Sequence, residues 1–377
     1  MKILRVVLIP PNGQLKKHDF SFQRIEKWLS KFDNIETTLL HIKPLNFTPD
    51  ISIFKSVIEV KNEEELFDIL NRLDFSFIFH RSWMGSYEFA ARIIKEFNKV
   101  IINIKDWNFA EKEVYESIFP NNKDHESIDF IFKNCNAILS HFTKEQYLPW
   151  AKEYNTNESK FIFFPEFCNE NNFNKRRPIK YKNIHLVYAG AIPPTSFPDE
   201  YFPGKSHLRS IKSLSKQKIN IDFVLPPHVY DTFFNPKGDF LDFILESKLN
   251  KRFNIVKGKE LNSEILNKYH FGFFELEASG KNHNLYKYAI TSKFAFYLEA
   301  GIPILINERF YSMASIVKKH KLGIIFKNSD LKDLNKKINI SQNEYNLFCK
   351  NINNFRKKFT YKVNVSDLRK IFNDEIS

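Results

Sequence analysis

The residues best suited to chemistry lie in one short stretch, Thr291 to Pro303. Thr291 or Ser292 can cap the start of a helix, and Gly301 suits the left-handed position that follows its end. The start of a helix offers free backbone N–H groups and a partial positive charge of about half a unit, which suit a phosphate. Lys293 in the first turn is unfavourable there unless an anion binds. We therefore predict an anion site; the alternative is a capped structural helix with a solvated lysine.

Two other candidates for chemistry follow predicted strands of the first half. Asp106 and Trp107 follow the apolar run 100–104, separated from it by Lys105. An aspartate at such a strand end can accept a proton from a hydroxyl group, although helix capping or an ion pair would also explain it. His80, with Arg81, closes the preceding predicted strand and is a second candidate base. A single histidine is more often structural, so both interpretations stay open.

The elements that position these residues alternate between strands and helices. Short apolar runs predict strands at 4–9, 37–42, 75–79, 100–104, 137–140 and 160–164 in the first half, and at 185–189, 221–225, 253–256, 271–274, 304–306 and 323–326 in the second. Amphipathic stretches predict helices at 20–31, 63–70, 86–97, 143–154, 205–216, 240–249, 262–269, 293–300 and 313–319. This alternation is typical of parallel sheets covered by helices on both faces.

The alternation stops once, near the middle of the chain. Residues 165–183 are polar and lack periodicity, which is typical of a linker between domains. We expect an N-terminal domain at 1–175, a second domain at 176–340, and a helical tail at 341–377. Two such α/β, Rossmann-like domains would face each other across a cleft, with the carboxyl ends of their strands turned toward it.

Composition narrows the class of protein. Three distant cysteines, Cys135, Cys168 and Cys349, predict neither a disulfide framework nor a zinc site and fit a reducing compartment. No apolar run reaches the roughly 20 residues that span a bilayer. The net charge of +13 attracts polyanions, and the densest basic cluster is Lys175–Lys182. That cluster is either a solvated linker or a contact with an anionic membrane surface.

The stretch 284–306 resembles the donor-binding segment of GT-B glycosyltransferases. The shared positions are Lys293, Tyr297-Leu298, Gly301, Pro303 and the strand 304–306, with Thr291 in place of the usual proline. The preceding residues, Tyr286-Lys287-Tyr288, resemble the corresponding residues in the branch that contains bacterial galactofuranosyl- and glucosyltransferases. Weaker similarities lie at His185–Gly190 and at 134–140 with 160–165. In scattered pieces the resemblance covers residues 137 to 326.

The resemblance implies a donor site for a nucleotide-diphosphate sugar, most simply a UDP-sugar, in the second domain. Its expected members are Gly190, Glu277, Tyr286, Lys287, Thr291, Ser292, Lys293, Glu299 and Gly301. A carboxylate following strand 271–274, Glu275 or Glu277, could orient the hydroxyls of the donor sugar. One departure is notable, because Phe296 replaces the glutamate that often holds the ribose. Recognition of the ribose would then shift to Glu299 or elsewhere.

The resemblance also implies the reaction and its partners. We expect transfer of a sugar to a glycan, lipid-linked or protein acceptor in bacterial polysaccharide or glycoconjugate synthesis, with Asp106 or His80 as base. Neither a metal nor another cofactor is expected, and the enzyme should be cytoplasmic or peripheral at the inner face of the membrane. The alternatives are a catalytically silent GT-B subunit and a nucleic-acid-binding protein. The second is disfavoured, because the basic residues form no stripe with aromatic ones.

Overall fold

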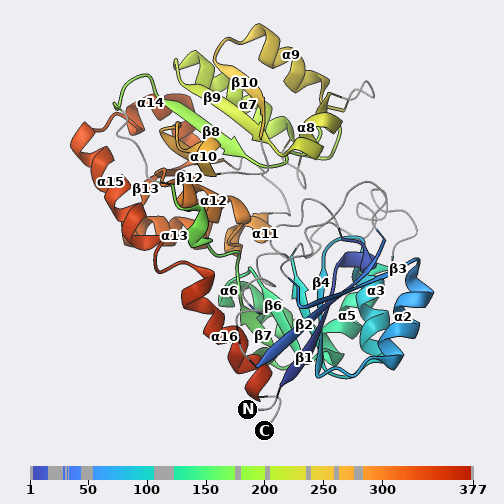
Figure 1. Cartoon of the computed structure of the whole chain (residues 1–377). Helices are drawn as coiled ribbons and strands as arrows, with labels where there is room; N and C mark the ends of the chain where they lie inside the picture. The colour runs from blue at the N-terminus through green and yellow to red at the C-terminus, as the bar shows by residue number, and fades with distance from the viewer. Residues whose placement is uncertain are drawn as a thin grey trace. The chain divides into compact units, whose positions relative to one another are not determined.

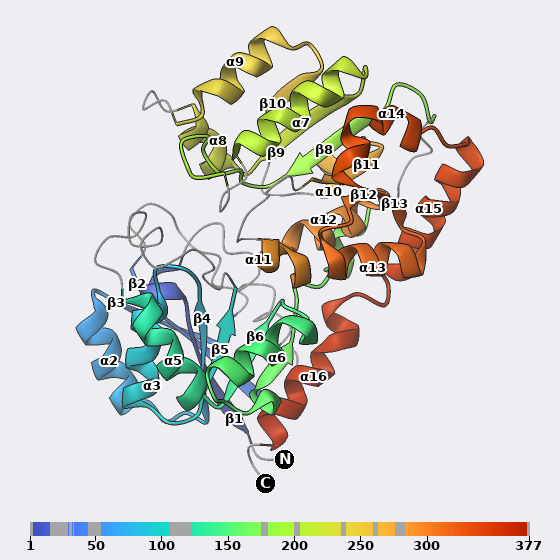
Figure 2. The same ribbon diagram turned by 180° about the vertical axis from the view of Figure 1, so that it is seen from behind.

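The computed structural model describes residues 3–15, 29, 32, 34–43, 54–105, 123–174, 180–199, 204–234, 239–258, 263–275 and 283–374. Within these ranges the strands form two parallel sheets, one of seven strands and one of six (Figures 1 and 2). The chain divides into two compact units. Unit 1 comprises Met1–Glu166 together with Tyr361–Ser377, and unit 2 comprises Phe167–Thr360. The α/β fold class with two sheets is confirmed.

The sheet of unit 1 has the strand order β3-β2-β1-β4-β5-β6-β7, with every neighbouring pair parallel. Its strands are β1 (Leu4–Ile9), β2 (Ile35–Ile42), β3 (Ser56–Val60), β4 (Phe77–Ser82), β5 (Val100–Ile104), β6 (Ala137–Ser140) and β7 (Phe161–Phe163). Helices α2 (Glu63–Arg72), α3 (Tyr87–Glu96), α5 (Asp124–Asn134) and α6 (Lys144–Glu153) accompany them. Every residue of β4 and β5 is buried, as expected for central strands of a covered parallel sheet.

The sheet of unit 2 has the order β10-β9-β8-β11-β12-β13 and is also parallel throughout. Its strands are β8 (His185–Ala189), β9 (Asn220–Leu225), β10 (Phe253–Lys257), β11 (Phe271–Phe274), β12 (Ile304–Asn307) and β13 (Gly323–Phe326). The helices are α7 (Gly204–Lys216), α8 (Pro227–Phe233), α9 (Leu241–Leu249), α10 (Ser263–Leu266), α11 (His283–Tyr288), α12 (Ser292–Ala300), α13 (Tyr311–His320), α14 (Leu334–Lys337) and α15 (Gln342–Phe355). A further helix, α16 (Tyr361–Asp374), belongs to unit 1.

Alternation along β8 places two cores on opposite faces of the unit 2 sheet. Leu186 and Tyr188 pack into the core that also receives Ile211 and Leu214 of α7. Val187 and Ala189 point the other way, into the core built by α12 and α13. Because successive side chains of a strand face opposite sides, one strand serves both cores. Tyr188 and α12 therefore both border the carboxyl end of β8, where ligands bind in such folds.

Helix α12 ends and docks as its sequence predicts. Gly301 has φ +72°, and the N–H groups of Gly301 and Ile302 bond to the carbonyls of Leu298 and Tyr297 at 3.0 and 3.1 Å. Thr291 occupies the N-cap position, but its side chain makes no capping hydrogen bond; its hydroxyl lies 3.8 Å from the sulfur of Met313. The expected side-chain cap is thus absent at this residue. The first N–H groups of the helix therefore receive no hydrogen bond from the Thr291 side chain.

Most predicted elements are confirmed, and the differences have physical causes. The predicted strand 75–79 is displaced to Phe77–Ser82, because polar His80, Arg81 and Ser82 continue it. Strand β3 was not predicted, since as an edge strand it lacks a continuous apolar run. Helices α5, α8 and α11 were also not predicted. The helix expected at 20–31 lies largely outside the described residues.

The polar segment after β7 makes specific contacts with α12 and with Thr360. Asn169 and Asn172 donate hydrogen bonds to the carboxylate of Glu299, and a bridge pairs Cys168 with Thr360. The predicted helical tail is confirmed as α15 and α16. The expected boundaries at 175 and 340, and the assignment of each domain to acceptor or donor binding, stay predictions. None of the described helices is long and apolar enough to cross a membrane.

Candidate functional site

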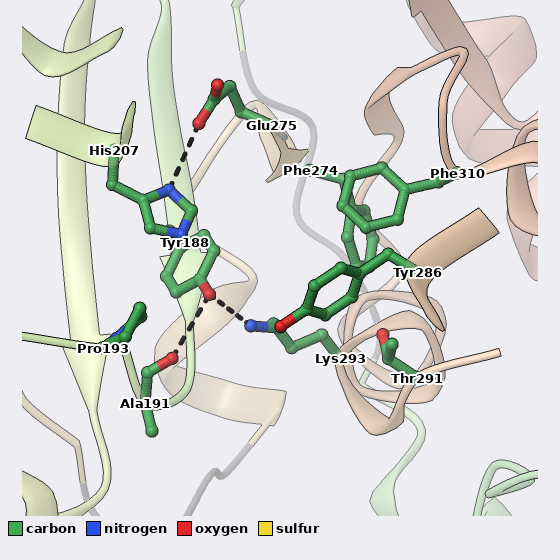
Figure 3. Close-up of a pocket in the computed structure, with 10 residues that line it drawn as sticks. All are labelled: Tyr188, Ala191, Pro193, His207, Phe274, Glu275, Tyr286, Thr291, Lys293 and Phe310. Carbon is green, nitrogen blue, oxygen red and sulfur yellow. Dashed lines mark hydrogen bonds and ion pairs between the residues drawn. The ribbon is translucent and has the colours of Figure 1, made fainter. Parts of the chain in front are cut away.

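A cavity of about 130 Å³ lies within unit 2, at the carboxyl ends of β8 and β11 (Figure 3). Four parts of the sequence contribute to it: the end of β8 with the loop that follows, the first turn of α7, the end of β11, and the segment from α11 to α13. The lining residues are Tyr188, Ala191, Pro193, His207, Phe274, Glu275, Tyr286, Thr291, Lys293 and Phe310. The cavity has the place in the fold that ligands take in open α/β sheets.

Lys293 is the cation of this cavity. It leaves the first turn of α12, and its ammonium lies 4.0 Å from the centroid of the Tyr188 ring and donates a hydrogen bond to the Tyr188 hydroxyl. Figure 3 shows the side chain reaching from α12 toward β8. The tyrosine hydroxyl in turn donates to the carbonyl of Ala191 at 3.2 Å. This pair therefore ties the helix to the loop after β8.

Partial burial changes the acidity of Lys293. Removal from water lowers the pKa of its ammonium from 10.5 to about 7, because burial disfavours the charged form. The aromatic face of Tyr188 is a weak substitute for an anion. A phosphate bound beside Lys293 would stabilise the charged form and raise this pKa again. Lys293 is thus partly buried and is not the solvated lysine of the alternative interpretation, and its charge has no anionic partner among the described residues.

Gly190 supplies a backbone conformation that suits glycine at the end of β8. Its φ is +125°, a conformation that side-chain-bearing residues rarely adopt. A Cβ at this position would lie 3.6 Å from the Lys293 ammonium nitrogen. The absence of a side chain at Gly190 therefore leaves the space beside the Lys293 ammonium open.

A buried carboxylate lies at the other end of the cavity. Glu275, 2% exposed, follows β11, and one of its oxygens lies 3.2 Å from Nδ1 of His207 in the first turn of α7. Its second oxygen is buried and has no hydrogen-bond partner among the residues that the structure describes. A buried carboxylate oxygen without a partner is costly, and a ligand hydroxyl that donates to it would remove the cost. The sequence indicated Glu275 by its strand-end position; nothing indicated His207.

The structure brings several of the predicted donor residues together. Tyr286, Thr291 and Lys293 line the cavity, and Ser292 is the first residue of α12 beside them. Tyr188, Phe274 and Phe310 were missed, because aromatic residues in apolar runs cannot be told from core residues by pattern alone. Glu277 lies outside the described residues. Its donor-binding role stays a prediction.

Three other predicted residues lie away from the cavity lining. The Lys287 ammonium stacks over its neighbour Tyr288, 4.9 Å from the ring centroid. Gly301 ends α12 at the opposite end from Lys293 and serves the turn. Glu299 is fully buried, and its two carboxylate oxygens accept hydrogen bonds from Asn169 and Asn172 at 2.7 and 3.3 Å. A donor contact for Glu299 is therefore corrected to a structural role, holding the segment after β7 against α12.

The candidate base His80 is a core residue of unit 1. It lies within β4 rather than at its end and is fully buried. Its Nδ1 donates to the carbonyl of Ile9 at 3.0 Å, since a carbonyl only accepts. Burial lowers the pKa of the imidazole to about 3, so it is neutral and weakly basic. These facts correct the hypothesis of a catalytic base at His80. Asp106 lies outside the described residues, and its role stays a prediction.

Polar side chains nevertheless gather at the carboxyl ends of the unit 1 strands. The Lys105 ammonium lies 4.0 Å from the carboxylate of Glu166, and Arg81 donates to Asn103 at 2.6 Å. Burial, reinforced by the nearby charges of Lys105 and Arg81, lowers the pKa of His141 to about 3. Among the described residues, no group of three or more histidine, cysteine, aspartate or glutamate side chains could hold a metal ion.

Comparison with known proteins agrees with this geometry. Residues 245–366 match the family model of the glucosyltransferase 3-like C-terminal domain, a range that includes Tyr286, Thr291 and Lys293. A search of curated proteins found none that matches the sequence significantly.

Solved structures share the fold over nearly the whole chain. HepE from Anabaena, in complex with UDP and glucose, superposes with a TM-score of 0.64 at 8% identity, covering 98% of this chain and 99% of its own. WaaG, a glycosyltransferase involved in lipopolysaccharide biosynthesis, gives 0.56 at 12% identity, with 94% and 95% covered. The E. coli trehalose-6-phosphate protein bound with UDP-2-fluoro glucose gives 0.62 at 10% identity, with 98% and 99% covered.

The two parallel sheets, the structural matches and the family match of the C-terminal region agree on one class. The chain has the GT-B fold of these glycosyltransferase structures, and its residues 245–366 match the family model of the glucosyltransferase 3-like C-terminal domain.

Proposed function

We propose that the cavity of unit 2 binds the diphosphate and sugar of a UDP-sugar, and that the protein transfers this sugar to a hydroxyl of a glycan, lipid-linked or protein acceptor. One observation carries the proposal: a single cavity holds a cation without an anionic partner, Lys293, and a buried carboxylate with an unpaired oxygen, Glu275. The cation suits a diphosphate, and the carboxylate can accept hydrogen bonds from sugar hydroxyls. HepE with UDP and glucose supports the choice of nucleotide.

The proposed reaction replaces one bond to the anomeric carbon by another. The bond from this carbon to the diphosphate oxygen breaks, the bond to the acceptor oxygen forms, and the acceptor proton passes to a base or to the departing phosphate. Positive charge develops on the sugar ring, as in glycoside chemistry. Negative charge develops on the UDP. Lys293 and the first N–H groups of α12 are placed to stabilise the departing diphosphate, which lowers the barrier of the chemical step.

The aromatic residues of the cavity give the site its shape. Tyr188 holds the Lys293 ammonium over its ring, and Tyr286 and Phe310 form another part of the wall, 6.2 Å apart between ring centroids. A cavity of about 130 Å³ is smaller than the roughly 300 Å³ or more of sites that enclose a whole drug-sized ligand. It therefore suits the diphosphate and sugar rather than the whole UDP-sugar. We assign the uridine to the neighbouring surface of unit 2.

The acceptor end of the reaction is proposed from the sequence. Asp106, two positions after the last residue of β5 in the sequence, is the proposed base, and bacterial polysaccharide or glycoconjugate synthesis is the proposed pathway. An anionic membrane surface is a proposed partner through Lys175–Lys182, of which residues 175–179 lie outside the described residues. Salt-sensitive binding to anionic vesicles at low ionic strength would support this partner.

The test uses the purified full chain and a panel of nucleotide sugars. We expect UDP-glucose or another UDP-sugar to raise the melting temperature more than the corresponding ADP-, GDP- and dTDP-sugars. We also expect slow release of UDP by hydrolysis in the absence of acceptor. If a UDP-sugar binds but neither hydrolysis nor transfer occurs with any acceptor tested, the protein is the catalytically silent alternative. If no nucleotide sugar binds, the proposal is wrong.

A further inference from the structure

A second cavity of unit 2 has no role in the proposed donor site. It lies between helix α7 and the 3-10 helix Asn328–Asp333, has a volume of about 240 Å³, and shares no lining residue with the donor cavity. Helix α7 contributes to both cavities from successive turns. His207 lines the donor cavity, whereas Ser210 and Ser213 line the second one.

The lining chemistry of this cavity favours an oxyanion. The polar lining residues are two cations, three hydroxyls and an amide: Arg209, Lys332, Ser210, Ser213, Ser329 and Asn328. The remaining lining residue is Leu331, so the lining contains no carboxylate. The nearest acid in the sequence, Asp330, already accepts the N–H of Lys327 at 2.8 Å and lies 3.3 Å from the ammonium of Lys337. Arg209 is already paired with Asp199 at 2.9 Å, so Lys332 provides the net positive charge of the lining.

One buried group points independently to a ligand. Ser210 is only 4% exposed, and within the described part of the chain its hydroxyl has no hydrogen-bond partner. A buried hydroxyl without a partner costs on the order of 1–3 kcal/mol, so such groups need an explanation. The neighbouring hydroxyl of Ser213 differs, because it donates to the carbonyl of Leu331 at 3.1 Å. An oxyanion in the cavity would accept the hydrogen of Ser210 and balance the charge of Lys332.

We propose that this cavity is a second ligand site, which binds the phosphate group of a small phosphate monoester. Lys332 and Arg209 would contribute charge and Ser210 a buried hydrogen bond. Arg209 also donates to Asp199 at 2.9 Å and to the Ser206 hydroxyl at 2.8 Å, which holds its guanidinium at the start of α7. The inference does not depend on the proposed function, since the two cavities have separate walls.

The first test measures binding of inorganic phosphate and glycerol 3-phosphate to the full chain by calorimetry. The background is Lys293→Ala, which removes the cation of the donor cavity. Saturable binding should persist in this background. Adding Lys332→Ala or Ser210→Ala should each weaken it about tenfold, the scale of one charge-assisted hydrogen bond. The matched control Lys216→Ala removes an exposed charge at the far end of α7 and should leave the dissociation constant unchanged.

Other outcomes separate the sources of the phosphate or overturn the proposal. Binding to phosphatidic acid vesicles but to neither small ion, if lost in Lys332→Ala, would identify a lipid headgroup as the ligand. Equal weakening by Lys216→Ala and Lys332→Ala would mean general attraction to a basic surface, and the site would be rejected. Absence of saturable binding to every probe would also overturn it. Thermal melts of each variant exclude unfolding as the cause.

Discussion

The ammonium of Lys293 lies 4.0 Å from the centroid of the Tyr188 ring, where the first turn of α12 meets the end of β8. The contact joins two elements that are about a hundred residues apart in sequence, and it holds a charge in place without an acid to neutralise it. A diphosphate would supply the missing negative charge. The first predictions therefore concern this pair.

Lys293→Ala should lower the transfer rate by roughly a hundredfold or more, the scale seen on losing one preorganised donor in an active site. Affinity for the intact donor should fall less, because the charge matters most when the diphosphate departs. Lys293→Arg should rescue only part of the rate, since a planar guanidinium replaces a compact ammonium. Initial-rate kinetics on both variants tests this. Normal turnover in Lys293→Ala would remove Lys293 from the donor site.

Binding of UDP near pH 8 should take up a proton. The free protein holds Lys293 with a pKa of about 7, so the side chain is mostly neutral at this pH, and a bound diphosphate would raise the pKa and recharge it. Calorimetry in buffers of different ionisation enthalpy measures the uptake directly. Lys293→Met should abolish it. An uptake that persists in Lys293→Met would come from another group and contradict this account of the cavity.

Lys293 should make the ligand-free protein less stable at low pH than at high pH, whereas a lysine in an ion pair adds stability while it is charged. The unfolded chain binds the lysine proton up to about pH 10.5, whereas the folded chain releases it near pH 7. Below pH 7 the cost of burying the charge is fully present, and it disappears as the pH rises from 7 to 10.5. Lys293→Met should therefore melt at least about 2 °C higher than the wild type at pH 6.5. The gain should vanish by pH 10.5.

Glu275→Gln tests the other end of the cavity. The amide keeps the volume of the side chain but is a weaker acceptor for sugar hydroxyls, so the transfer rate should fall at least about tenfold, the value of one charge-assisted hydrogen bond. UDP itself, which lacks the sugar, should bind with unchanged affinity. Glu308→Gln, an exposed acid after β12, is the matched control. Equal loss of UDP and UDP-sugar binding would show that Glu275 shapes the cavity as a whole rather than contacts the sugar.

The sequence predicted the fold more fully than the site. Buried parallel strands consist of short apolar runs, which is why β6, β8 and β11 were placed correctly. The start and end of α12 were also predicted, because Thr291 and Gly301 mark them locally in the sequence. Contacts between residues that are distant in the sequence could not be predicted. The contact of Lys293 with Tyr188 and that of Glu275 with His207 join distant segments, and a single sequence contains no signal for such pairs.

The same limit explains the misassigned residues. Glu299 and His80 looked available because their types are chemically active, but tertiary packing buries both. The carboxylate of Glu299 satisfies the N–H of Asn169, and His80 bonds to Ile9 in the neighbouring strand β1. Burial of this kind depends on which elements pack together. Periodicity within one element does not reveal it.

Tyr297→Phe should destabilise unit 2 by about 1–3 kcal/mol. The Tyr297 hydroxyl accepts the N–H of Ala189 at 3.0 Å and donates to the carbonyl of Val187 at 3.1 Å, which joins α12 to β8 in the core. Its removal leaves buried backbone groups without a partner. Urea unfolding measures the change, and Tyr311→Phe on the exposed face of α13 is the control. A loss below about 0.5 kcal/mol would show that these backbone groups find other partners.

His80 should make the protein sensitive to acid without contributing to catalysis. Its folded pKa of about 3 lies below the ordinary value of 6.5, so between these pH values the unfolded chain binds a proton that the folded chain does not. Stability from this residue is thus present above pH 6.5 and is lost as the pH falls toward 3. One pKa unit corresponds to about 1.4 kcal/mol. Between pH 7 and pH 5 the loss should be about 2 kcal/mol.

His80→Gln removes this group and should flatten the pH dependence by that amount in urea unfolding followed by tryptophan fluorescence. The variant will be less stable at pH 7, because the bond to Ile9 and the packing against Phe89, 5.4 Å away between ring centroids, are disturbed. At pH 5 the deficit should shrink. His141, also with a pKa of about 3, keeps a part of the acid sensitivity in the variant. The transfer rate of folded His80→Gln should stay within about threefold of the wild type, since general-base catalysis is worth a hundredfold or more. A larger loss of rate at full folding would return His80 to the catalytic machinery.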